Sequence, residues 1–129
     1  MTLALNTITS TILDAAIFVH RELGPGLLES VYQECLYLEL TERGLKAEQF
    51  VSIPIQYRGE FLGKHFTIDI LVEDSIVLEL KAVEKILPVH EAQLISYLKI
   101  ADKQIGLLIN FNEKLLKDGF KRFVNKFTG

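Results

Sequence analysis

The spacing of the apolar residues changes near residue 48, and this change is the feature that most constrains the fold. Between residues 7 and 43 the apolar side chains recur every three or four positions, which predicts helices over 7–23 and 27–43 with a Gly-Pro-Gly turn between them. From Glu48 onward Val51, Ile53 and Ile55 alternate with polar residues, which predicts a strand. Pro54 removes a backbone donor from this strand and therefore favours an edge position.

The rest of the chain predicts three further elements and one ambiguous segment. Residues 61–72 and 76–83 are rich in branched apolar residues and predict a hairpin that turns at Glu73-Asp74-Ser75. A helix over 89–101 follows Pro88, and the apolar run 104–111 predicts a strand covered on both faces. Segment 113–126 fits either a helix or a strand. The expected fold is α/β (α+β), a mixed sheet flanked by helices in the order α, α, β, β, β, α, β plus a C-terminal segment.

Length and composition limit the class of protein. A chain of 129 residues is expected to form one domain over 1–129, and 49% apolar with 24% charged residues excludes a disordered chain. No apolar run approaches the ~20 residues that cross a bilayer, and no basic region precedes the N-terminal apolar stretch, so we expect a cytoplasmic protein without a membrane partner. The single Cys35 and three scattered histidines form no zinc pattern, so any metal would be held by oxygen.

Charge is distributed unevenly along the chain. The net charge of −3 argues against strong nucleic-acid binding by the molecule as a whole. Residues 112–129 nevertheless contain five basic and two acidic residues. This segment is either a solvated face or a phosphate-binding surface, and in the second case Lys117, Lys121 and Arg122 are the candidate contacts.

The hairpin carries the residues that suggest chemistry. Alternation places Glu79 and Lys81 on one face of their strand. A three-residue loop at 73–75 pairs Val72 with Ile76, and counting outward places Asp69 opposite Glu79. A two-residue loop would mix the apolar rows across both faces, so the hydrophobic pattern favours the longer loop.

Two carboxylates in this register would repel each other, because like charges on opposed strand positions destabilise a sheet. A hard divalent cation, Mg²⁺ or Mn²⁺, prefers carboxylate oxygen and would neutralise Asp69 and Glu79. Lys81 could neutralise part of the charge directly and stabilise a developing negative charge on phosphate. From spacing alone, a solvated strand face that carries Asp, Glu and Lys fits equally well.

Several motifs resemble one nuclease superfamily. Asp69 followed by Glu79-Leu80-Lys81 is similar to the signature of PD-(D/E)xK nucleases, with Ile68 where that motif often has proline. The segment GLLESVY at 26–32 matches the motif that names the GxxExxY family, a small branch of the superfamily. The resemblance extends through VHRELGPGLLESVYQECL at 19–36, FTIDILVEDSIVLELKAV at 66–83 and QLISYLK at 93–99.

The resemblance implies a restriction-endonuclease-like fold and a site. The implied catalytic residues are Glu29, Asp69, Glu79 and Lys81, together with Gln93 and Tyr97 of a Q-x-x-x-Y element and His20, and the implied ligands of Mg²⁺ or Mn²⁺ are Glu29, Asp69 and Glu79. The implied function is hydrolysis of phosphodiester bonds in nucleic acid, with DNA favoured over RNA. A catalytically silent nuclease fold that binds a partner remains the alternative. Such folds often pair, so a homodimer is compatible, although no interface is predicted.

Overall fold

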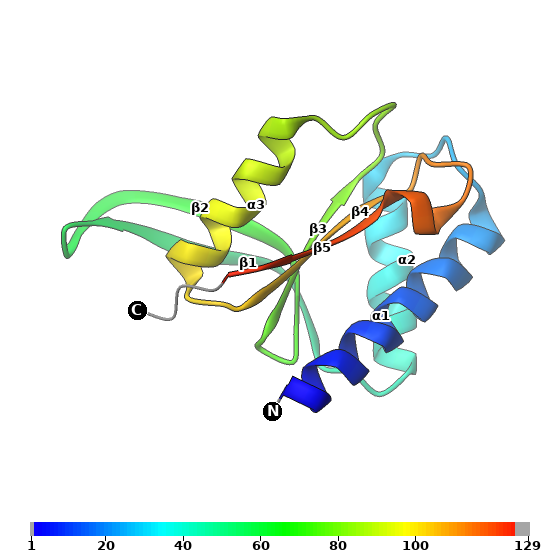
Figure 1. Ribbon diagram of the computed structural model, residues 1–129, viewed down its shortest axis with the longest axis horizontal. Helices are drawn as coiled ribbons and strands as arrows, with labels where there is room; N and C mark the ends of the chain where they lie inside the picture. Colours follow the sequence, from blue (N-terminus) through cyan, green and yellow to red (C-terminus); the bar gives the residue numbers. More distant parts are fainter. Residues whose placement is uncertain (1, 126–129) are drawn as a thin grey trace.

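A five-stranded mixed sheet crosses the molecule, and its strands are ordered β1-β2-β3-β4-β5 (Figure 1). The computed structural model describes residues 2–125. Neighbouring strands are antiparallel except for the parallel pair β3 and β4. This confirms the predicted mixed sheet and the edge position of the strand that contains Pro54. The strands are β1 (Ala47–Tyr57), β2 (Glu60–Val72), β3 (Ile76–Lys81), β4 (Ile105–Asn110) and β5 (Phe120–Val124).

The helices cover both faces of this sheet. Helices α1 (Thr2–Leu23) and α2 (Glu29–Glu42) pack on one face, and α3 (Pro88–Ala101) packs on the other (Figure 1). The predicted stripe of α1 is buried, because Ile12, Ala15 and Ala16 are fully shielded from solvent. The restriction-endonuclease-like α/β architecture is thus confirmed. No helix in the described part of the chain is long and apolar enough to cross a membrane.

Strand β4 lies at the centre of the fold, as its continuous apolar run predicted. All six of its residues are buried, and they contact helices on both faces. Gly106 allows α3 to approach closely, since a Cβ at this position would lie 2.9 Å from the side chain of Leu94. A larger residue would push α3 away from the sheet.

The ambiguous C-terminal segment resolves into a short turn and a strand. A 3₁₀ turn, η1 (Leu116–Gly119), leads into β5, which pairs antiparallel with β4. Phe120 packs into the core on the α1/α2 side and Phe123 into the core on the α3 side. The strand conformation therefore depends on pairing with a distant partner, which local periodicity does not reveal. Lys126 lies outside the described residues.

The β2–β3 hairpin has the predicted register. Val72 pairs with Ile76, Leu71 with Val77, and Ile70 with Leu78. The ladder ends there, one pair short of Asp69 and Glu79, so these two residues do not form the regular cross-strand pair that we expected. Strand β2 separates from β3 at this point.

The separation coincides with a change of layer in β2. Ile70 and Val72 belong to the core beneath α1 and α2, whereas Phe66 and Ile68 belong to the core beneath α3. Alternate residues of a flat strand would share one face, so the β1–β2 ribbon must twist sharply at Asp69. Asp69 therefore lies at a crossover between the two layers, next to the carboxyl end of β3.

Candidate active site

The carboxylate of Asp69 is held by the backbone of β3. Its Oδ2 accepts a hydrogen bond of 2.8 Å from the N–H of Leu80, so the side chain takes the place of a backbone carbonyl from β2. The carbonyl of Asp69 accepts a bond of 3.0 Å from Nε2 of Gln33 on α2. Backbone and side chain of Asp69 are thus fixed from two different elements, which limits how far the carboxylate can move.

Glu79 is the most deeply buried acid of the group, with 6% of its surface exposed. Strand β3 directs it to the same face as Val77, the face that α3 covers. Its Oε1 atom is shielded from solvent and has no hydrogen-bond partner. A buried oxygen without a partner is costly, because it has lost its water and gained nothing in return.

Asp69 and Glu79 share one electrostatic environment. Burial raises the pKa of Glu79 to about 8, and the negative charge of Asp69 contributes to the rise. Burial also raises the pKa of Asp69, although the hydrogen bond from Leu80 and the charge of Lys81 oppose the rise. Side-chain hydrogen bonding with Glu79 also opposes the rise in the pKa of Asp69. Without a cation the pair therefore retains a proton at neutral pH, and two full negative charges are avoided.

Lys81 and Glu29 border this pair from different elements. The charge of Lys81 lowers the pKa of Asp69, Glu79 and Glu29 alike, so its ammonium group lies within electrostatic range of all three. Glu29 lies in the first turn of α2, and the residue as a whole is exposed. Partial burial of its carboxyl group and the charge of Asp69 raise its pKa. Within residues 2–125 no three His, Cys, Asp or Glu side chains are arranged to hold a metal ion. Binding of a metal by Glu29, Asp69 and Glu79 together stays a prediction. The structure brings Asp69 and Glu79 together and places Glu29 within electrostatic range of both.

Helix α3 adds Gln93 and Tyr97 to the edge of the site. Burial and then the charges of Glu79 and Asp69 raise the pKa of Tyr97, and a hydrogen bond with Gln93 opposes the rise. The ring of Tyr97 stacks on Phe66 with centroids 4.0 Å apart. The tyrosine is thus fixed by stacking on β2, just below the crossover, while its hydroxyl lies in the field of the two acids.

His20 has a different environment. Its ring is buried, and Nε2 lies 2.8 Å from the carbonyl oxygen of Glu113, in the turn that follows β4. This bond joins the end of α1 to a residue 93 positions away. The structure therefore gives His20 a role as a link between α1 and this turn, and a part for His20 in the chemistry stays a prediction.

Tyr32 has a structural role that sequence reasoning did not assign. Its hydroxyl donates a hydrogen bond of 2.5 Å to the carbonyl of Gly24 and accepts one of 3.0 Å from the N–H of Leu27. The ring stacks on Phe111 with centroids 4.7 Å apart. Tyr32 thereby closes the turn between α1 and α2 and fixes where α2 begins. The first turn of α2 carries Glu29.

Gln33 and Asn110 are two further residues that sequence reasoning missed. Gln33 is buried and, besides its bond to Asp69, donates a hydrogen bond of 3.2 Å to Gln49 on β1. Asn110 is fully buried and bonds both the N–H and the carbonyl of Val83, which fixes the chain as it leaves β3. In the sequence, the sign of a buried structural role was the same for both residues: a polar amide side chain among apolar residues.

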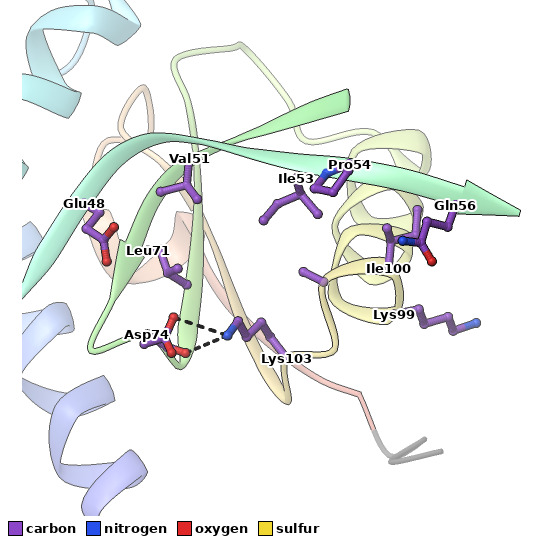
Figure 2. Close-up of a pocket in the computed structure, with 11 residues that line it drawn as sticks. Glu48, Val51, Ile53, Pro54, Gln56, Leu71, Asp74, Lys99, Ile100 and Lys103 are labelled. Carbon is purple, nitrogen blue, oxygen red and sulfur yellow. Dashed lines mark hydrogen bonds and ion pairs between the residues drawn. The ribbon is translucent and has the colours of Figure 1, made fainter. Parts of the chain in front are cut away.

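A groove of about 660 Å³ lies between β1 and the carboxyl end of α3 (Figure 2). Val51, Ile53 and Leu71 contribute apolar surface, and Lys103 lies across from them. None of the candidate site residues lines this groove. The chemistry-bearing residues and this groove are therefore separate features.

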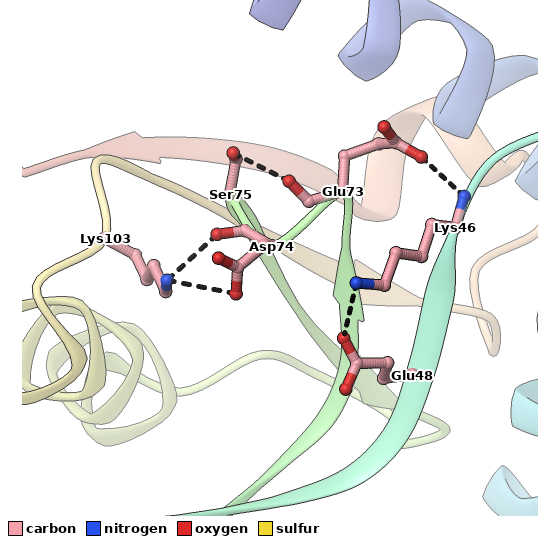
Figure 3. Close-up of polar contacts among 6 residues, drawn as sticks. All are labelled: Lys46, Glu48, Glu73, Asp74, Ser75 and Lys103. Carbon is pink, nitrogen blue, oxygen red and sulfur yellow. Dashed lines mark hydrogen bonds and ion pairs between the residues drawn. The ribbon is translucent and has the colours of Figure 1, made fainter.

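A second acidic pair lies in the turn of the β2–β3 hairpin (Figure 3). The carboxylate of Glu73 accepts a hydrogen bond from the N–H of Lys46, and Lys103 Nζ lies 3.4 Å from Oδ1 of Asp74. Lys46 Nζ also lies 3.8 Å from Glu48. These charges are met by partners on neighbouring elements, so they stabilise the turn.

The basic residues near the C-terminus lie at the β5 edge, at the other side of the sheet from β1. Lys121 forms an ion pair of 2.8 Å with Glu91 at the start of α3. Lys117 lies in η1 and Arg122 in β5, and both are exposed. Their contact with phosphate stays a prediction.

Comparison with known proteins gives one match. The sequence model described as the PD-(D/E)XK nuclease superfamily matches residues 6–123, which is most of the chain. No curated protein and no solved structure gives a match. The matched region contains every residue of the site described above.

Proposed function

The chain belongs to the PD-(D/E)XK nuclease superfamily, and from that premise we propose that it is a Mg²⁺- or Mn²⁺-dependent nuclease that hydrolyses phosphodiester bonds. One observation carries the proposal: Oε1 of Glu79 is buried without a partner, directly beside a second carboxylate. Hydrogen bonding with Asp69 reaches the Glu79 carboxyl group but leaves this oxygen unused, whereas a buried polar atom in a protein generally has a partner.

The chemistry of this donor pair fits a divalent cation. Mg²⁺ is commonly held by one or two carboxylates, and its remaining positions are filled by water and substrate phosphate. Asp69 and Glu79 supply the two carboxylates, and the unpartnered oxygen of Glu79 supplies an unused lone pair. A bound divalent cation would activate water for attack on phosphorus and stabilise the leaving oxygen.

The other residues are proposed to act around this pair. Lys81 places a positive charge within range of all three acids, where it would stabilise the negative charge that develops on the phosphate. Glu29, exposed at the start of α2, would bind water at the border of the site. Tyr97 and Gln93 would orient the substrate from α3. His20 is left out of this group because its ring is bonded to Glu113.

We also propose membership of the GxxExxY branch. The geometry that supports it is the role of Tyr32, which closes the turn at Gly24 and thereby sets the start of α2, where Glu29 lies. The spacing of Glu29 and Tyr32 in the motif thus has a physical basis, because Tyr32 bonds residues on both sides of the motif glycine, Gly26. We propose DNA as the substrate in preference to RNA.

The alternative is a nuclease fold that binds nucleic acid without cutting it. The net charge of −3 and the small size of the chain, 129 residues, suit this alternative. It predicts binding without turnover, so the two proposals differ in one measurable property.

The deciding experiment is cleavage of end-labelled single- and double-stranded DNA and RNA in the presence of Mn²⁺. The proposed nuclease cuts at least one substrate, and EDTA or the Asp69→Asn substitution abolishes cutting. Retained metal binding with no cleavage of any substrate would favour the binding protein.

A further inference from the structure

The β1–β2 hairpin projects from the body of the protein as a two-stranded ribbon (Figure 1). Among the described residues, the pairing of β2 with β3 is limited to residues 70–72 of β2, so the preceding part of β2 has β1 as its only neighbour in the sheet. Every residue from Glu60 to His65 is exposed. An isolated ribbon of this kind is marginal in water, so its exposed apolar residues require an explanation.

Aromatic and basic side chains gather at the end of this ribbon. We call residues 57–64 the hairpin arm. Tyr57 is 64% exposed and Phe61 54% exposed, although aromatic rings normally contribute to a core. Arg58 and Lys64 are exposed, and within the described part of the chain neither has an ion-pair partner. The arm carries two cations and one acid, Glu60, on a chain whose net charge is −3.

The base of the ribbon is fixed, and its far end is turned by an irregularity. Phe66 stacks on Tyr97 of α3, and Val51 and Ile53 pack in the same core. Between the pairs Pro54–His65 and Gln56–Phe61 the register shifts, and Gly63 adopts a positive φ of 73°. Bulges of this kind re-aim a strand and are frequent next to functional sites. The arm is thus anchored at the site and redirected beyond it.

We propose that the hairpin arm binds double-stranded DNA on one side of the cleavage position, with Arg58 and Lys64 at phosphates and Tyr57 and Phe61 against the groove. This inference rests on the proposed nuclease function. A two-stranded ribbon fits the major groove of B-form DNA, whereas the major groove of A-form RNA is too narrow and deep for side chains. Phe61 lies eight residues from Asp69, which is at most ~26 Å along a strand, or about 8 base pairs of duplex.

The test measures binding without cutting. Affinity for a labelled 24-base-pair DNA duplex is measured by fluorescence anisotropy in Mn²⁺, in a Lys81→Ala background, over a range of salt concentrations. The variant R58A/K64A should bind at least about 10-fold more weakly at 0.1 M salt, and its salt slope should fall by about two units, since each phosphate contact contributes about 0.9. Y57S/F61S should weaken binding with little change in slope.

The matched control is R43A/K46A, which removes the same charge from two cations that already pair with Glu39 and Glu48. Equal affinity and slope for the arm variant and this control would overturn the proposal. Equal loss of affinity for a 24-base-pair RNA duplex would overturn the assignment to DNA. Conversion of a dimer to a monomer by Y57S/F61S, with DNA affinity unchanged, would show that a second copy of the chain covers the arm.

The inference and the proposed function fail in different ways. If the wild-type protein cuts DNA and R58A/K64A binds and cuts equally well, the arm proposal is wrong and the nuclease proposal stands. If the wild-type protein cuts nothing but loses DNA affinity in R58A/K64A, the arm proposal stands and the nuclease proposal is wrong. Melting temperatures verify that each variant is folded.

Discussion

Two acidic pairs lie on the same β2–β3 hairpin, one in its turn and one at its open end. Glu73 and Asp74 in the turn meet Lys46 and Lys103, so each acid has a donor from a neighbouring element (Figure 3). At the open end Glu79 is buried, one of its oxygens has no partner, and its pKa is raised to about 8 by burial and by Asp69.

The two pairs differ in how their acids are satisfied by the surrounding protein. The turn pair contributes little to the free energy of unfolding, because exposed ion pairs are typically worth less than about 1 kcal/mol. Its carboxylates nevertheless have partners. In the buried pair, Leu80 and Gln33 hold Asp69 beside Glu79, although without a cation the pair must keep a proton to avoid two opposed charges. A fold that keeps such a pair is expected to stabilise a cation there.

The largest expected difference between the two pairs is in cleavage. Asp69→Asn should reduce the cleavage rate by more than about 10³-fold, because it removes a proposed metal ligand. Asp74→Asn, the matched substitution in the turn, should leave the rate within about 2-fold of wild type. Equal loss in both variants would remove the distinction on which the site assignment rests.

The lysines associated with the two pairs give the next largest contrast. Lys81→Ala should retain the Mn²⁺-induced rise in melting temperature but lower the cleavage rate about 10²-fold, because its proposed charge acts at the transition state. Lys103→Ala removes a cation that pairs with Asp74 and should leave cleavage unaffected. A Lys81→Ala variant with wild-type turnover would exclude a catalytic role for this lysine.

The pH dependence of stability should separate the pairs more finely. Between pH 4.5 and about 8 the folded protein keeps the proton on Glu79 that the unfolded chain has released, so the free energy of unfolding falls as pH rises through this window. The slope is at most about 1.4 kcal/mol per pH unit. Urea unfolding without metal should show this slope in wild type and in Asp74→Asn but a much smaller one in Glu79→Gln. A wild-type slope in Glu79→Gln would contradict the raised pKa.

The smallest expected effect is on the salt dependence of DNA binding, where Arg122 and the ion-paired Lys121 at the β5 edge are compared. Arg122→Ala should lower the salt slope of DNA binding by about one unit if Arg122 contacts phosphate. Lys121→Ala should change the slope less, because Glu91 already neutralises this lysine. Unchanged slopes in both variants would make this edge a solvated surface.

The β2–β3 register was predictable because the hydrophobic alternation and the three-residue loop determine it together. The edge position of β1 was predictable from Pro54 for a similarly local reason. The crossover at Asp69 was not, since the twist arises where the β1–β2 ribbon leaves β3. The bond between His20 and Glu113 joins residues 93 positions apart, so no local pattern reveals it.

The candidate site could be predicted from the sequence only where its geometry depends on a single strand. The face that Glu79 shares with Lys81 follows from alternation along one strand, whereas the position of Glu29 relative to Asp69 depends on how α2 packs across the sheet. The sequence did not reveal the support that Gln33 and Asn110 give to the site, because these buried amides form hydrogen bonds with residues that lie far away in sequence. Their polar character in apolar surroundings was the only local sign.

The central claim is that the buried pair is a divalent cation site, and the anomalous scattering of Mn²⁺ in a soaked crystal tests it most directly. We expect an anomalous peak between the carboxylates of Asp69 and Glu79 that disappears in Asp69→Asn crystals, with none at the turn pair Glu73 and Asp74. A peak at the turn alone, or no peak beside Glu79, would contradict it.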